Sequence, residues 1–358
     1  MAMATEQIAE GMERLLGGPV HDRSTDQLMD DMEFALMASG SAATAAEYRR
    51  MVEHFVAFLE QCGEAVSLMT ARRTHVQVYV KHLGKPEAAL ARLIDGCPVC
   101  RATPTRPADG YSASYVKRHL AALRAAYRFL RSEDVVKEDT TLDVRAPKVA
   151  AGRQYVPSRE EVRALLDYRG TPKSRLLVRL AYYAPARRAE LARMRYRDID
   201  EHGVWHLTAK GGRSHAYELH PEVMRALRDY ARWQRTQPKL RAALSDDDTA
   251  YVFLTRWGRP TSGGQLVRLL KRHAIRAGVA VIPARGKEWD AIDGKTSRLS
   301  PHALRRAWAS HVLNDPSSPV PIDVVSAVLG HRDIATTRKH YAFTDDDRAF
   351  KALRHHRL

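Results

Sequence analysis

The sequence predicts a mainly α-helical protein with a small β-sheet, built from two domains. Its length of 358 residues exceeds the usual size of a single domain. Apolar residues recur at helical spacing in several stretches, which indicates amphipathic helices packed on a core. One pair of short β-like runs flanks a turn that contains glycines, which is typical of a β-hairpin.

The N-terminal domain is predicted over residues 25–145 as a helical domain. Residues 44–61 form an amphipathic helix with a core-facing stripe of Tyr48, Met51, Val52, Phe55, Phe58 and Leu59. A second helix is expected over 112–132, capped by Ser112, with the apolar face Val116, Leu120, Leu123, Tyr127 and Leu130. The stretch between them at 84–110 is rich in proline and glycine, so it is predicted to be a long loop or a small insertion.

The helix at 112–132 also carries a basic ridge, and its residues are the candidate DNA-binding residues of this domain. They are Lys117, Arg118, Arg124, Arg128 and Arg131. Such a ridge suits the phosphates that line a DNA groove. A solvated helix face explains the same charges equally well, so both interpretations stay open here.

The three cysteines of the chain do not indicate a disulfide framework. Cys97 and Cys100 have the spacing of half a zinc site, whereas a complete structural site needs four ligands. Cys62 with a histidine such as His54 or His119 could supply the remainder only through tertiary packing. We therefore expect paired surface thiols and no bound metal.

Residues 146–157 have the composition of an interdomain linker. They separate this domain from a second one, predicted over 158–358. The second domain opens with a helix whose capping box pairs Ser158 with Glu161. Further helical segments follow along the remainder of the chain.

The strand pair of the second domain is predicted at 203–208 and 215–220. The turn between these runs contains Lys210 and two glycines. The stretch 279–298 is predicted to be an unusually long loop.

The positive charge of the chain lies almost entirely in the second domain. Residues 1–150 hold 19 Lys and Arg against 20 Asp and Glu, whereas residues 151–358 hold 39 against 22. A basic half of this kind favours a polyanionic partner, with nucleic acid first. No apolar run is long enough to span a membrane and the N-terminus lacks the pattern of a signal peptide, so we expect a cytoplasmic protein, associated with the nucleoid if its partner is DNA.

Three short motifs carry residue types suited to phosphate chemistry. In the first, Ser300 is a good N-cap and Pro301 suits the first helical position, which places His302 and Arg305 on one face of the first two turns. A helix start with a histidine and an arginine resembles a phosphate site with the capacity for proton transfer.

The second motif surrounds Arg187. Pro185 is interpreted as a first-turn proline, so Arg187 would lie near a helix N-terminus, and Glu190 could orient its guanidinium. In isolation this motif is weak evidence for a site.

The third motif covers the end of the chain. Gly330 fits a helix C-terminus, His331 lies in the break, and Asp333 could cap a helix that carries Tyr341. A buried core tyrosine is the default interpretation of Tyr341 alone.

Taken together and in this order, these residues resemble the tyrosine recombinase (phage integrase) family. The resemblance covers about 158–350, and residues 25–145 resemble, more loosely, the helical core-binding domain of the family. It implies a SAM-like N-terminal domain and a C-shaped clamp on DNA. It also implies six catalytic residues, namely Arg187, Lys210, His302, Arg305, His331 and Tyr341.

The resemblance also implies the chemistry of these residues. Arg187 and Arg305 would clamp the phosphate oxygens, and His331 would donate a further hydrogen bond. Tyr341 would attack the phosphorus with help from His302 as base, and Lys210 would protonate the departing 5′-oxygen. We therefore expect a DNA strand transferase that needs neither a metal nor another cofactor.

Partners follow from the same resemblance. We expect double-stranded DNA with an inverted-repeat core site, a homotetramer on two such sites, and a monomer when DNA is absent. The tail 344–358 is expected to pack on a neighbouring protomer. The sequence departs from the family where glycine is common two residues before the first catalytic arginine, because Pro185 stands there.

Two other functions stay open at this point. A type IB topoisomerase would use similar chemistry as a monomer. A non-catalytic DNA-binding protein would resemble a recombinase but would not cleave DNA. Within the recombinase interpretation, only about 25 residues precede the first core-binding helix, which favours a simple two-domain enzyme. Its role would be to integrate and excise a small mobile element or to resolve dimers.

Overall fold

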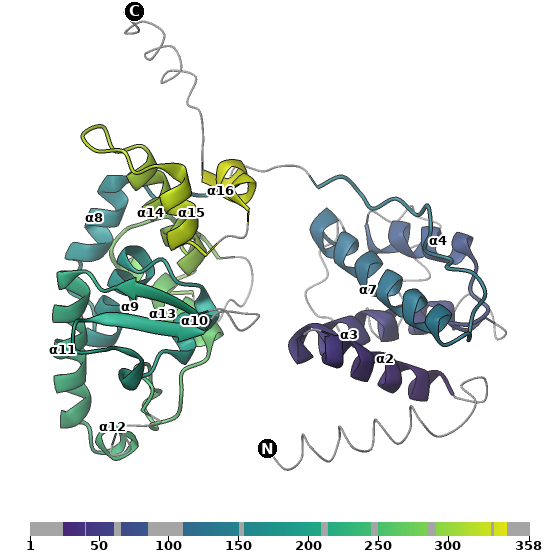
Figure 1. Ribbon diagram of the computed structural model, residues 1–358, viewed down its shortest axis with the longest axis horizontal. Coiled ribbons are helices and arrows are strands. Elements are labelled where there is room, and N and C mark those ends of the chain that lie inside the picture. The colour runs from purple at the N-terminus through teal and green to yellow at the C-terminus, as the bar shows by residue number, and fades with distance from the viewer. Residues whose placement is uncertain are drawn as a thin grey trace, which may run out of the picture. The chain divides into compact units, whose positions relative to one another are not determined.

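The computed structural model divides into two compact units, Met1–Gly152 and Arg153–Leu358 (Figure 1). The structure describes residues 24–39, 41–60, 66–84, 110–149, 154–208, 214–244, 250–284, 291–330 and 333–341. Several predictions lie outside these residues: those for Lys210 and His331, for the three cysteines, for most of the 84–110 insertion and for the tail 344–358. Each unit is described by itself below.

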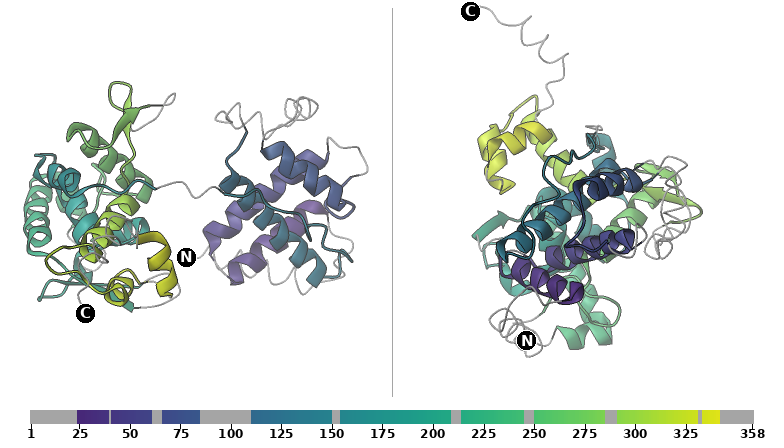
Figure 2. Two further views of the ribbon diagram at one scale, coloured as in Figure 1. Left: turned by 90° about the horizontal axis from the view of Figure 1, so that it is seen from above. Right: turned by 90° about the vertical axis from the view of Figure 1, so that its right-hand side faces the viewer.

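Unit 1 is a bundle of helices (Figure 2). Its core is made of aromatic and aliphatic side chains. Its helices are α2 (Thr25–Ser39), α3 (Ala42–Leu59), α4 (Arg73–Leu83) and α7 (Ala113–Ser132). The predicted helices at 44–61 and 112–132 are confirmed as α3 and α7, and the Ser112 hydroxyl accepts the Tyr115 N–H at 3.3 Å as the predicted cap. Phe55, Phe58 and Leu59 are fully buried in α3, as their spacing predicts.

Unit 2 packs helices on one small sheet and carries a second sheet beside them (Figure 1). Its helices are α8 (Arg159–Asp167), α9 (Pro172–Tyr183), α10 (Arg188–Arg193), the short 3-10 helix η2 (Tyr196–Asp198), α11 (Pro221–Thr236), α12 (Pro238–Ala243), α13 (Gly263–Arg276), α14 (Pro301–Leu313), α15 (Ile322–Val328) and α16 (Ile334–Tyr341). Helix α9 contacts α11, α13 and α14, so it lies at the centre of the unit.

The first sheet confirms the predicted hairpin. Strand β1 (Val204–Thr208) pairs antiparallel with β2 (Ser214–Glu218), and Trp205 lies opposite Tyr217. Both of these side chains are buried, because residues that face each other across an antiparallel pair share one face of the sheet.

The second sheet corrects the prediction of a simple loop at 279–298. Strand β3 (Val281–Pro283) pairs antiparallel with β4 (Lys295–Ser297), and β4 contacts α13. Strands of three residues are too short to give a periodic signal, so sequence patterning alone could not identify them.

The structure confirms two predicted caps and corrects a third. The Ser158 hydroxyl accepts the Glu161 N–H at 3.2 Å, and the Ser300 hydroxyl accepts the Ala303 N–H at 3.1 Å. Pro185, however, is not a first-turn proline: Arg187 is the extended N-cap residue (φ −71°, ψ 152°) and α10 starts at Arg188. The proline lies in the short segment before α10, where the Ala184 carbonyl accepts the Ala186 N–H, and the Pro185 carbonyl accepts from Arg305.

Candidate functional site

Arg187 lies at the N-terminus of α10 and is held there by Glu190. One oxygen of the Glu190 carboxylate accepts the backbone N–H of Arg187 at 2.6 Å, and the other accepts Nη1 at 3.0 Å. The Glu190 side chain is 10% exposed and the Arg187 side chain 38% exposed. Glu190 therefore fixes both the backbone and the side chain of an arginine whose guanidinium still reaches solvent, as the sequence suggested.

Arg305 lies in the second turn of α14 and is only 2% exposed. Its Nη1 donates to the carbonyl oxygen of Pro185, and its Nη2 donates to that of Leu329. A buried guanidinium needs acceptors for its N–H groups, and backbone carbonyls supply two of them here. These bonds join three segments that are distant in sequence around one guanidinium.

The two arginines meet at one turn of the chain. Leu329 and Gly330 follow α15, and Gly330 has φ +61°, the left-handed conformation expected of a glycine that ends a helix. The Leu329 carbonyl accepts from Arg305, and the Gly330 carbonyl accepts from Nη2 of Arg187 at 3.4 Å. The structure therefore brings the side chains of Arg187 and Arg305 to the same turn.

His302 lies in the first turn of α14 with an exposed side chain. Partial burial and the nearby positive charges of Arg305, Arg306, Arg187 and Arg188 lower its pKa below the ordinary value for histidine. The imidazole is therefore neutral at pH 7 and has a lone pair free to accept a proton.

Tyr341 is the last residue of α16, and this helix contacts both α14 and α15. The Asp333 carboxylate accepts the Ala335 N–H at 2.8 Å, which confirms the predicted cap at the start of α16. Of the six predicted catalytic residues, Arg187, His302 and Arg305 are described with their side chains. Tyr341 is described by its place in the helix alone.

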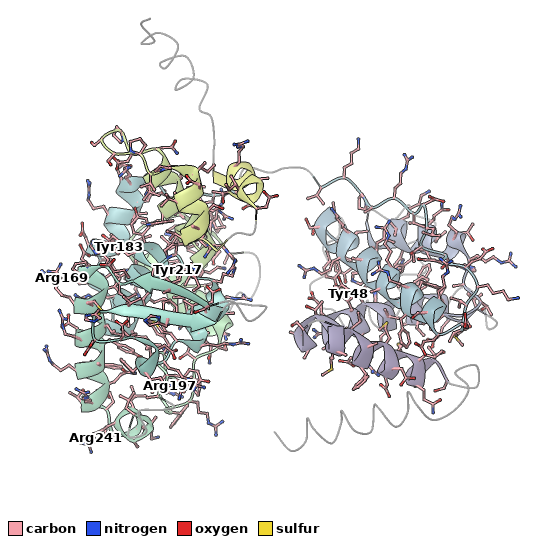
Figure 3. All side chains as sticks on the ribbon, in the orientation of Figure 1. Tyr48, Arg169, Tyr183, Arg197, Tyr217 and Arg241 are labelled. Atoms are coloured by element: carbon pink, nitrogen blue, oxygen red, sulfur yellow. The ribbon has the colours of Figure 1, made fainter. Side chains whose placement is uncertain are left out.

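Tyr217 is a neighbour of the arginines that sequence reasoning missed. Its side chain is 5% exposed on β2 (Figure 3), and burial raises the pKa of its phenol. Arg305, Glu190 and Arg187 are close enough to act on this phenol electrostatically. The alternation of β2 predicts that Tyr217 faces inward, but only the fold shows what it faces.

The basic ridge of α7 has all five predicted side chains at the surface. Arg118 donates to the Glu47 carboxylate at 2.6 Å, and Arg124 donates to the Val144 carbonyl at 2.9 Å. The exposed Arg118–Glu47 pair contributes little to stability, so both of its members can exchange partners.

Within the described residues, no group of three or more His, Cys, Asp or Glu side chains is arranged to hold a metal ion. No helix in the same part of the chain is long and apolar enough to cross a membrane.

Comparison with known proteins identifies relatives that span most of the chain. A model of the phage integrase family matches residues 158–348. Tyrosine recombinase XerD of Corynebacterium glutamicum is 29% identical over 317 residues, which cover 86% of this chain and 89% of that protein.

Two solved structures have the same fold. The XerH site-specific recombinase, bound to a palindromic difH substrate after cleavage, matches with a TM-score of 0.62 at 16% identity, covering 98% of this chain and 88% of that one. A lambda integrase tetramer bound to a Holliday junction matches with a TM-score of 0.57 at 16% identity, covering 96% and 88%.

Proposed function

The chain belongs to the phage integrase family, and we propose that it recombines DNA at specific sites by cutting and rejoining strands through a bond to Tyr341. The observation that carries the proposal is the convergence of Arg187 and Arg305 on the consecutive carbonyls of Leu329 and Gly330. That turn immediately precedes His331, and α16, which ends at Tyr341, contacts α14.

The two arginines are suited to bind one DNA phosphate. The hydrogen bonds described above use two N–H donors of each guanidinium, which has five, so further donors remain for the non-bridging oxygens. Their bonds to Glu190 and to backbone carbonyls fix the guanidinium planes before DNA binds. Donors held in advance stabilise the charge that develops in the transition state without reorganising.

The proton transfers follow from the same arrangement. A tyrosine phenol ordinarily has a pKa of about 10, so a base must take the proton of Tyr341 as its oxygen attacks phosphorus. His302 is suited to that step because its lowered pKa keeps the imidazole unprotonated at pH 7. The Tyr341 oxygen–phosphorus bond forms, the phosphorus–O5′ bond breaks, and Lys210 gives a proton to the departing oxygen.

Rejoining is the same reaction in reverse. A 5′-hydroxyl from the exchanged strand gives its proton to Lys210 as it attacks the phosphotyrosine. The O5′–phosphorus bond forms, the Tyr341 oxygen–phosphorus bond breaks, and His302 returns a proton to the phenol oxygen. Since the covalent bond conserves the phosphodiester linkage, no ATP or other cofactor is required.

The assembly that we propose is a tetramer on two DNA sites, formed by protomers that are monomeric without DNA. The solved neighbours include a tetramer on a Holliday junction and a complex with a palindromic site, which supports an inverted-repeat substrate here. Since the substrate is DNA, we propose that the protein acts in the cytoplasm at the nucleoid. We assign DNA backbone contacts in unit 1 to the exposed ridge of α7, from Lys117 to Arg131.

Covalent trapping on the DNA that flanks its own gene tests the function. We expect the protein to form a covalent adduct on one specific sequence, and Tyr341→Phe to shift the same DNA without forming it. Relaxation of supercoiled DNA without any site dependence would instead indicate a topoisomerase. Binding without cleavage by the unaltered protein would contradict the enzyme assignment.

A further inference from the structure

At the C-terminal end of α15, the consecutive carbonyls of Val328, Leu329 and Gly330 each accept from a side chain. Besides the bonds from Arg305 to Leu329 and from Arg187 to Gly330, Nε2 of His215 lies 2.9 Å from the carbonyl oxygen of Val328. The last carbonyls of a helix lack partners within the helix, so they are available to such donors. Elements α10, α14 and β2 are thereby joined at one turn.

The bond from His215 has a defined direction. A carbonyl oxygen only accepts, so Nε2 of His215 carries the proton and donates it to Val328. His215 and Tyr217 lie on the same face of β2, and their rings pack edge to face with centroids 4.6 Å apart. Since Tyr217 is buried beside Arg305, this face of β2 meets the arginine site at two points.

His215 and Val328 are close in sequence to two residues of the proposed reaction. His215 is in the strand that follows Lys210, the proposed proton donor to the leaving oxygen. Val328 opens the turn that binds both arginines and leads to His331. We propose that His215 is a positioning residue for strand cleavage, whose hydrogen bond to Val328 keeps the strand after Lys210 in register with the phosphate-binding turn. This inference rests on the proposed function.

The expected defect lies in one step of the reaction. As the Tyr341 oxygen bonds to phosphorus, the phosphorus–O5′ bond breaks and O5′ takes a proton from Lys210. A β2 strand released from Val328 would let Lys210 move away from O5′, while Arg187 and Arg305 keep their own bonds to the turn. We therefore expect proton transfer to the leaving O5′ to slow, while the affinity for the phosphate stays the same.

Three variants of the full-length protein separate positioning from folding. His215→Leu removes the donor, whereas His215→Gln keeps an N–H at similar reach. His206→Leu is the matched control: His206 is on β1, exposed on the opposite face of the same sheet, and its ring bonds to Asp200 at 2.7 Å. Adduct formation is measured in a single turnover, at saturating protein, on a nicked suicide duplex that carries the mapped cleavage site.

Two versions of that duplex give the decisive comparison: one with the ordinary bridging O5′, and one with sulfur in its place. A thiolate leaves without needing a proton, so cleavage of the sulfur duplex does not depend on the general acid. On the oxygen duplex we expect His215→Leu to be slower by about tenfold or more, within the factor of about 100 to 10,000 that a positioned acid contributes. His215→Gln and His206→Leu should stay within about threefold of the unaltered protein, below the roughly fivefold effect of a typical net hydrogen bond of about 1 kcal/mol.

On the sulfur duplex, His215→Leu should cleave as fast as the unaltered protein. An equal loss of cleavage rate on both duplexes would overturn the inference. So would a loss of cleavage rate in His215→Gln as large as that in His215→Leu. A His215→Leu protein that cleaves the oxygen duplex at full rate would overturn it as well. Failure of the unaltered protein to form an adduct on either duplex would instead refute the proposed function on which the inference depends.

Discussion

The carboxylate of Glu190 binds Arg187 at two points, through the backbone N–H at 2.6 Å and through Nη1 at 3.0 Å. The first bond caps α10 and the second orients the guanidinium toward the Gly330 carbonyl. One side chain therefore both starts a helix and aims a phosphate-binding group. This arrangement explains why an arginine occupies an N-cap position, where small polar residues are usual.

Glu190→Gln tests this double role. The amide keeps one acceptor oxygen but presents an NH₂ group to the donors of Arg187, so one bond is lost. Hydrogen bonds to charged groups are worth about 1.5–3 kcal/mol, so we expect cleavage to slow by about 10- to 100-fold. Single-turnover cleavage measures this, with Glu201→Gln as the control because the Glu201 side chain is 87% exposed. Equal rates in the two variants would contradict the role of Glu190.

Arg305→Lys tests the need for a planar guanidinium. A lysine keeps the charge, but one ammonium cannot serve Pro185, Leu329 and a phosphate in the geometry of the fork. We expect cleavage to fall by about 100-fold or more, the usual effect of losing one preorganised donor. Retention of DNA in a gel shift shows that the loss is in catalysis. Cleavage within about threefold of the unaltered protein would show that charge alone is sufficient.

The pH dependence of cleavage tests His302 as the base. Since burial and neighbouring arginines lower its pKa, the acid limb of the rate profile should lie below the ordinary histidine pKa of about 6.5. Arg306→Gln removes one of the charges that lower this pKa, so the fall should move to higher pH. Rate profiles of both proteins check the shift. Identical profiles would remove Arg306 from the environment of the titrating group.

Metal removal tests how the phosphate charge is neutralised. Because two guanidinium groups supply positive charge at the phosphate in our proposal, adduct formation should continue in the presence of EDTA. Cleavage assays with EDTA, and with added magnesium as the comparison, measure this. Loss of cleavage in EDTA that magnesium restores would favour a metal-dependent nuclease mechanism.

The stability of unit 1 should decrease in acid because of His119. Burial, with the nearby His54, lowers the pKa of His119 to about 3, while an unfolded histidine has a pKa near 6.5. The unfolded state therefore binds more protons between pH 6.5 and 3. As the pH is lowered through this range, the free energy of unfolding decreases by up to about 1.4 kcal/mol per pH unit. His119→Asn, which does not titrate, should give a shallower dependence.

Hydrogen exchange of the α7 amides measures this change, since His119 lies within that helix. Tryptophan fluorescence is the internal control, because all five tryptophans of the chain are in unit 2. An acid-induced loss of protection that is equally steep in His119→Asn would assign the effect to other groups.

The sequence alone determined the features that depend on close neighbours in the chain. The caps at Ser112, Ser158 and Ser300, the glycine end of α15 and the β1–β2 hairpin all follow from interactions across a few residues, and the structure has each of them. The same local patterns, in their order along the chain, sufficed for the family resemblance.

The tertiary structure decided what these local features bring together. Arg305 is buried because carbonyls of two remote segments, at Pro185 and Leu329, satisfy its N–H groups, and no local pattern encodes those partners. The contact of His215 with Val328 and the burial of Tyr217 beside Arg305 depend in the same way on how β2 packs on α14 and α15. The physical reason is that a short-range motif fixes backbone conformation, whereas hydrogen bonds between distant segments exist only once the core has packed them side by side.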